Sequence, residues 1–190
     1  MDESEKIVYR IVRSRRKTFA VQVMDDGSVV VKAPLLSTDV QARRIVEKKA
    51  NWIRRTRARI LRNRSIAEKM GGKLSRDELG ELRTGARKLI PERVEHYAEI
   101  IGVRYGKVTI RAQKSRWGSC SCCGNLSFNC LLMLAPPEVL DSVVVHELCH
   151  LKQMNHSPRF YDEVRKAFPE YDRWNRWLKN NGPALMARLP

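Results

Sequence analysis

Alternating apolar and polar residues near the start of the chain predict β-strands. The alternation runs over residues 7–11 and again over residues 19–23, as expected for strands with one buried face. The sequence Asp-Asp-Gly at 25–27 is a hairpin-turn signal, and the apolar run that follows it is the returning strand. We therefore expect a small antiparallel sheet over residues 6–33.

The periodicity then changes to that of a helix. From Ser37 or Thr38, either of which can serve as the N-cap, residues up to 64 place apolar side chains at helical spacing on one face. The opposite face, within residues 41–64, is rich in Arg and Lys. A second helical pattern covers residues 75–102, and Pro91 inside it should kink or split the helix.

The second half of the chain mixes strands and helices. Residues 107–113 and 125–134 read as two strands, and we expect them to pair as a hairpin with a long tip. Three helices should follow: one opened by the prolines at 136–137, one capped by Ser157, and a last one stopped by Asn181 and Gly182.

This order of elements predicts an α+β fold with a small mixed or antiparallel sheet, an N-terminal β-hairpin region and long helices. Two parts are expected: residues 1–70, with the hairpins and the basic helix, and residues 71–190. At 190 residues, the chain is also short enough for both parts to form one compact unit.

Composition narrows the class of protein. No stretch of about eighteen apolar residues exists, so no membrane span is expected. The first ten residues are too charged for a secretory signal, and the cysteines number five, which favours free thiols over disulfides. We therefore expect a cytoplasmic protein.

The net charge is +16, and the densest basic stretch is the helix at 41–64. Such a charge favours polyanionic partners, and nucleic acid bound along this helix is one interpretation. The other interpretation is a solvated face of an ordinary amphipathic helix.

Candidate chemistry is concentrated in one short segment. His146, Glu147 and His150 form the motif H-E-x-x-H, which on a helix directs both imidazoles to the same side, one turn apart. That arrangement suits one tetrahedral zinc ion, and Glu147 is then placed to take a proton from water. The helix is strongly apolar, so histidines buried there without an ion would lack partners. Cys149, inside the motif, should point to the core.

A catalytic zinc site needs a third protein ligand and one position for water. His156 lies six residues after His150, close enough to fold back onto the ion. Glu163 and Glu170 are the rival ligands, and either of them would otherwise hold the second nitrogen of a histidine from outside the ligand set. A single zinc ion held by His146, His150 and His156 is the expected cofactor.

Two functions from different classes follow. One is a zinc-dependent metallopeptidase that hydrolyses peptide bonds, with Glu147 as general base; the other is a nucleic-acid-binding protein with a structural zinc. A second zinc site would need more ligands than the cluster of Cys120, Cys122 and Cys123 supplies. We interpret that cluster as a turn between strands.

Three segments together resemble a known family. They are RSRRKTFAVQV, KSRWGSCSCCGNLSFNCLLML and VVVHELCHLKQMNHSPRFYDEV, which look like the bacterial YgjP-like predicted metallopeptidases, relatives of the SprT-like zinc proteases. The resemblance implies a zincin-like fold, in which a small mixed sheet packs on the H-E-x-x-H helix. It also implies His146, His150 and His156 as zinc ligands and Glu147 as the catalytic base.

The SprT-like relatives act on proteins attached to DNA, so the resemblance raises nucleic-acid-associated proteins as substrates. A strand beside the metal helix could bind the substrate backbone as an added strand, and residues 126–132 are the candidate. Arg116 and Tyr161 are candidate donors to a developing oxyanion, with a simple salt bridge as the alternative for Arg116. Trp117 is expected to anchor the core.

Overall fold

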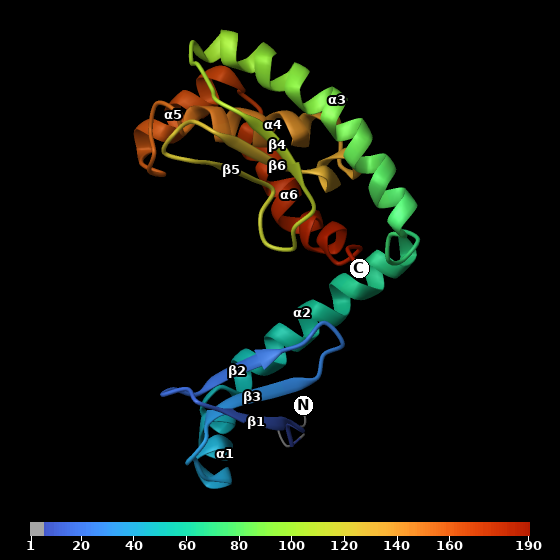
Figure 1. Ribbon diagram of the computed structural model, residues 1–190, viewed down its shortest axis with the longest axis vertical. Coiled ribbons are helices and arrows are strands. Elements are labelled where there is room, and N and C mark those ends of the chain that lie inside the picture. Colours follow the sequence, from blue (N-terminus) through green and yellow to red (C-terminus); the bar gives the residue numbers. More distant parts are fainter. Residues whose placement is uncertain (1–5) are drawn as a thin grey trace. The chain divides into compact units, whose positions relative to one another are not determined.

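The computed structural model describes residues 6–190. The chain folds as two compact units, Met1–Ile66 and Ala67–Pro190, drawn from blue to teal and from teal to red in Figure 1. Both combine helices with a three-stranded sheet, so the predicted α+β class is confirmed. None of the helices among the described residues is both long and apolar enough to cross a membrane.

The first unit contains a sheet with the strand order β1-β3-β2. Its strands are β1 (Arg10–Ser14), β2 (Ala20–Val23) and β3 (Val29–Pro34). The hairpin between β2 and β3 is confirmed, with Gly27 at φ +83° in its turn. The expectation of an antiparallel sheet is wrong for β1, which pairs with β3 in parallel. Apolar alternation fixes which face of a strand is buried but not the direction of its neighbour.

Two helices complete this unit. They are α1 (Asp39–Lys48) and α2 (Ala50–Lys69), where the sequence suggested one. Thr38 caps α1 in a capping box with Gln41. Ala42, Val46 and Ile53 are buried with the sheet residues Val29 and Val31, so the predicted apolar face forms the core of the unit.

The second unit is built on the long helix α3 (Arg76–Ile101) and the apolar helix α4 (Pro137–Cys149). Its other elements are β4 (Val108–Arg111), β5 (Gly118–Cys120), β6 (Leu126–Asn129), the 3-10 helix η1 (Cys130–Leu134), α5 (Pro158–Ala167) and α6 (Tyr171–Met186). The split predicted at Pro91 is wrong, because α3 continues across it. Ile90 and Val94 on either side are fully buried, and this packing outweighs the lost backbone hydrogen bond.

The second sheet has the order β4-β6-β5, with β4 parallel and β5 antiparallel to β6. The predicted hairpin between residues 107–113 and 125–134 is therefore wrong, because the expected tip contains a strand of its own. Residues 126–132 are also not an edge: β6 is the central strand, and residues 130–134 form η1.

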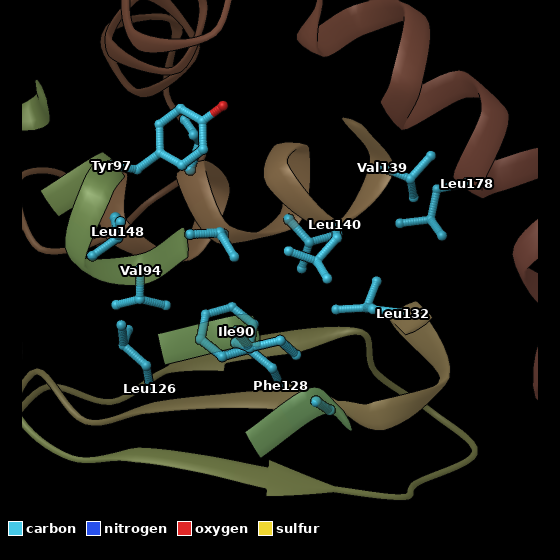
Figure 2. Close-up of a cluster of buried hydrophobic side chains, with 14 of the residues drawn as sticks. Ile90, Val94, Tyr97, Leu126, Phe128, Leu132, Val139, Leu140, Leu148 and Leu178 are labelled. Atoms are coloured by element: carbon cyan, nitrogen blue, oxygen red, sulfur yellow. The ribbon is translucent and has the colours of Figure 1, made fainter. Parts of the chain in front are cut away.

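The core of this unit lies between α3, α4 and β6. Figure 2 shows Ile90 and Val94 of α3 facing Leu126 and Phe128 of β6, with Leu148 among the neighbouring side chains. All five are at most 1% exposed. Burial on this scale fixes α4, the helix that carries the H-E-x-x-H motif, between a helix and a sheet.

The last helix, α6, does not stop at Asn181 and Gly182 as predicted but runs on to Met186. Gly182 is required here for another reason: a Cβ atom built on it would lie 2.9 Å from the Trp117 ring. Trp117 is half-buried against the core cluster, in line with its expected anchoring role.

Candidate active site

Helix α4 and the turn after it bring the three histidines of the motif region together. His146 lies in the last turn of α4, His150 caps its C-terminus, and His156 precedes Ser157, the N-cap of α5. The ring centroids are 4.9 Å apart for His146 and His150, 5.0 Å for His146 and His156, and 4.7 Å for His150 and His156. The backbone tightens after Leu148 through hydrogen bonds to the third residue before, Leu151 N to Leu148 O and Lys152 N to Cys149 O, both 3.0 Å. The chain thus turns between Cys149 and His156 without a glycine.

The histidine cluster has the dimensions of a metal site. One nitrogen from each ring lies within 4.8 Å of the other two, and the Nε2 atoms of His146 and His156 are 3.0 Å apart. Two nitrogens bound to one tetrahedral zinc at 2.0–2.1 Å would be separated by roughly 3.3 Å. The donor set therefore fits a zinc ion after small movements of the rings.

The remaining ring nitrogens of two histidines are already held. His150 Nδ1 lies 3.1 Å from the carbonyl oxygen of Gln153, which can only accept, so Nδ1 donates and Nε2 stays free for an ion. His146 Nδ1 lies 2.8 Å from the Tyr171 hydroxyl. Such contacts fix the orientation of a metal-binding ring and its tautomer.

Glu163 and Glu170, the alternative candidates for the third ligand, form ion pairs with other residues. Glu163 pairs with Lys152 at 3.0 Å, and Glu170 pairs with Arg173 at 3.0 Å. Neither belongs to the group of potential metal-binding side chains, and neither contacts a histidine nitrogen. The outer partners are Tyr171 and the Gln153 backbone instead.

An aromatic floor lies against the cluster. The Phe160 ring, fully buried on α5, has its centroid 4.9, 4.6 and 5.0 Å from those of His146, His150 and His156. Sequence reasoning missed this role. A phenylalanine in the first turn of a helix is common, so nothing in the sequence indicated that Phe160 would contact the histidines.

Burial sets the protonation of the histidines. It lowers the pKa of His146 to about 3, with the neighbouring His150 and His156 acting in the same direction. Burial likewise lowers the pKa of His150. Both imidazoles are therefore neutral near pH 7 and have a lone pair to offer to a cation.

Glu147 follows His146 directly on α4 and packs against Gly118 of β5. Its side chain is 6% exposed, and burial raises its pKa to about 7, while the charge of Arg116 and a backbone hydrogen bond with Cys120 act in the opposite direction. A carboxyl group with a pKa near the working pH is suited to general acid–base catalysis.

The strand β5 lies directly against this carboxylate. A Cβ atom added to Gly118 would lie 2.6 Å from both Cγ and Oε1 of Glu147. Only glycine leaves room for the carboxylate there. Residues 117–120, the stretch W-G-S-C, lie in a segment that resembles a known family. Nothing in the sequence indicated the contact between Gly118 and Glu147.

A pocket of about 280 Å³ opens beside Glu147 and His146. Its lining combines side chains from the segment before β5, from α4 and from α6, among them Arg116, Trp117, Val143, Asn175 and Leu178. A reacting group in this pocket would meet the candidate base and one candidate ligand together.

The other residues considered from the sequence lie around this centre. Tyr161 has its ring centroid 6.1 Å from that of His156. Cys149 is fully buried in the core, as expected. Cys122 and Cys123 are exposed, with their sulfur atoms 3.9 Å apart. In the described part of the chain these cysteines belong to no group of three potential metal ligands.

Comparison with known families identifies the class of this site. The model of the YgjP-like metallopeptidase domain matches residues 17–80 and 79–181, which is most of the chain. The chain belongs to the YgjP-like metallopeptidase family. Its predicted class, a zinc metallopeptidase, is thereby confirmed at the level of the family. A search of curated proteins returned no significant match.

Two solved structures of metallopeptidase zymogens are also similar to this chain. Abylysin of Pyrococcus abyssi is 28% identical, with a TM-score of 0.44, and the match covers 48% of this chain and 94% of abylysin. Jannalysin of Methanocaldococcus jannaschii is 24% identical, with a TM-score of 0.44, and the match covers 49% and 96%.

Proposed function

We propose that this YgjP-like protein hydrolyses peptide bonds with one zinc ion held by His146, His150 and His156. The observation that carries the proposal is the pocket shared by Glu147 and His146, next to a histidine cluster whose ring nitrogens lie within 4.8 Å of one another. The zinc supplies a Lewis acid and lowers the pKa of its water to about 7. A cytoplasmic location stays a prediction from the sequence.

The chain's own groups then carry the proton transfers. Glu147 takes a proton from the attacking water and later gives it to the nitrogen of the leaving amine. Gly118 leaves the space in which this carboxylate sits. Tyr171 and the Gln153 carbonyl keep the two helix histidines turned towards the ion.

The test of this proposal is the substitution Glu147→Gln. Hydrolysis of an unstructured protein such as casein by the zinc-loaded protein should fall by at least about 100-fold, in line with the loss of a general base. Metal content and melting temperature should stay close to those of the wild type, because the amide side chain would occupy the same space as the carboxylate that it replaces.

The matched control is Glu163→Gln. Glu163 is a carboxylate on the following helix that pairs with Lys152, so its loss should leave hydrolysis and metal content unchanged. A fall in metal content in this control would make Glu163 a ligand. Loss of metal and fold together in Glu147→Gln, with no hydrolysis by the wild type, would favour the alternative of a structural zinc.

The arginines of helix α2, in the first unit, support a second proposed function, nucleic-acid binding. Between Ala50 and Ala67 the helix α2 has six arginines and no acidic residue. Arg55, Arg59 and Arg62 are exposed, lie at helical spacing on one face and make no ion pair within residues 6–190. We propose that this stripe, together with exposed Trp52 on the same face, binds nucleic acid and directs the peptidase to proteins associated with it.

A further inference from the structure

The pocket beside Glu147 has a marked charge arrangement. Arg116 lines it, and in the described part of the chain no carboxylate lies within ion-pair distance of this guanidinium. The Asn175 amide lines the pocket as well, and it makes no hydrogen bond to another residue among 6–190. Two sets of N–H donors therefore face the pocket without a protein partner.

Two hydroxyl groups of the pocket already have partners. The Ser142 hydroxyl donates to the Val139 carbonyl at 2.7 Å, and the Tyr171 hydroxyl contacts His146. Glu147 is the single acidic residue of the lining, and β5 packs against it through Gly118. Arg116 is therefore the only guanidinium or ammonium group of the lining, and its neutral donors are Asn175, the Ser115 hydroxyl and the Trp117 indole.

Part of the pocket lining is apolar. Trp117, Val143 and Leu178 all line the pocket, and Val143 and Leu178 are only 6% and 8% exposed. A ligand that suits these surfaces has a short hydrocarbon stem and an anionic end. Arg binds a carboxylate through two parallel hydrogen bonds, which makes it more selective than a single point charge.

We infer that this pocket binds a carboxylate of the substrate through Arg116 and so makes the enzyme prefer peptides with an anionic group next to the cleaved bond. The inference rests on the proposed peptidase function. The carboxylate has two sources, a Glu or Asp side chain inside the substrate and the free C-terminus of a peptide. Asn175 assists by donating from the opposite helix, α6.

The experiment measures binding separately from hydrolysis. Zinc-loaded Glu147→Gln protein is mixed with fluorescent peptide pools of random composition whose ends are blocked and whose central residue is Glu, Gln or Lys. A fourth pool has central Gln and a free C-terminal carboxylate. Fluorescence anisotropy gives the affinity for each pool, and the wild type is assayed for cleavage of the same pools.

The expected result is binding of one carboxylate pool about tenfold tighter than the blocked Gln pool, the order of one charge-assisted hydrogen bond. A preference for the Glu pool assigns the pocket to a side chain, and a preference for the free-acid pool assigns it to a C-terminus. Adding Arg116→Gln should reduce either preference to less than about twofold. The matched control Arg111→Gln, which removes an exposed arginine of β4, should keep it.

A charge-reversal variant distinguishes loss of the carboxylate site from loss of the fold. The Arg116 carbonyl accepts a hydrogen bond from Asn129, and this backbone contact survives any side-chain change. Arg116→Glu should therefore invert the preference and favour the Lys pool, an outcome that an unfolded protein cannot produce.

Three results would overturn the inference. The first is equal binding of all pools by Glu147→Gln. The second is a preference that persists in Arg116→Gln. The third is a kcat that Arg116→Gln lowers equally for every pool, which would assign Arg116 to the developing oxyanion. If carboxylate pools bind through Arg116 but the wild type cleaves none of them, the carboxylate site stands, whereas the proposed peptidase function and the cleavage preference that rests on it fail.

Discussion

At the scale of single residues, the candidate site depends on the absence of a side chain at Gly118. Gly118 has no Cβ, and the Glu147 carboxylate occupies the space beside it. Without that space Glu147 would have to leave its position between β5 and α4. The glycine therefore determines where the proposed general base lies, although it has no chemistry of its own.

Gly118→Ala tests this dependence. Its Cβ would lie 2.6 Å from Glu147 Oε1, so the carboxylate must move, and a displacement near 1 Å costs about 100-fold in rate. We expect casein hydrolysis to fall by about 10- to 100-fold while zinc content stays the same. The control Gly80→Ala, with open space around the added methyl group, should keep full activity. Unchanged hydrolysis in Gly118→Ala would contradict this role.

The residues of the site differ in how far the sequence could predict them. His146 and His150 follow from their spacing on one helix, and His156 follows from its distance to them. Tyr171 and Phe160 contact the same histidines, but they come from helices whose packing no local pattern encodes. Spacing within an element is visible in the sequence, whereas a contact between elements depends on how they pack.

At the scale of elements, α4 is fixed to α3 by a partly buried ion pair as well as by apolar packing. Arg93 of α3 donates to both carboxylate oxygens of Asp141, at 2.7 and 2.5 Å, and the Tyr97 hydroxyl donates to Asp141 Oδ2 at 3.3 Å. Asp141 precedes His146 on the same helix. The pair therefore sets the position of the helix that carries the site.

Asp141→Asn should destabilise the second unit. Breaking a fully buried pair costs about 3–5 kcal/mol, but the Arg93 side chain is 35% exposed and regains water. We expect a loss of about 2 kcal/mol in the free energy of unfolding, measured with urea. Asp172→Asn, which breaks an exposed pair with Arg165, is the control and should cost clearly less, because solvent screens such a pair. Equal losses in both variants would contradict the role of the pair between Arg93 and Asp141.

The elements themselves were more predictable than their arrangement. Helical periodicity and caps such as Thr38 and Ser157 located the helical regions and the starts of α1 and α5, whereas the break between α1 and α2 and the end of α6 were missed. The direction of pairing was wrong for β1 and β4, which lie parallel to β3 and β6, strands that are not next to them in the sequence. Alternation records the burial of one face, and the neighbour of a strand is decided by the rest of the unit.

At the scale of the whole molecule, positive charge is divided unevenly between the two units. Residues 6–66 have seventeen Lys and Arg against four acidic residues, whereas residues 67–190 have twenty against fourteen. The unit with the candidate active site is thus the less basic of the two. Because both units belong to one chain, a polyanion bound by the first would raise the local concentration of the peptidase around it.

The proposed stripe on α2 makes a prediction about salt. A polyanion bound through arginines releases counterions, so affinity for a short fluorescent DNA duplex should fall steeply as salt rises. Replacing Arg55, Arg59 and Arg62 together by Gln should weaken binding and reduce the slope of log K against log salt by up to about 2.7, the contribution of three phosphate contacts.

The control for the stripe replaces three exposed arginines of the second unit, Arg76, Arg87 and Arg104, and removes the same net charge. If charge alone attracted the duplex, both triple variants would lose the same share of the slope. If the stripe binds the duplex locally, the α2 variant should lose clearly more of the slope. Adding Trp52→Ala to it should further weaken the binding of single-stranded DNA, because an exposed ring stacks on unpaired bases. Binding of the wild type that ignores salt would contradict the electrostatic mechanism itself.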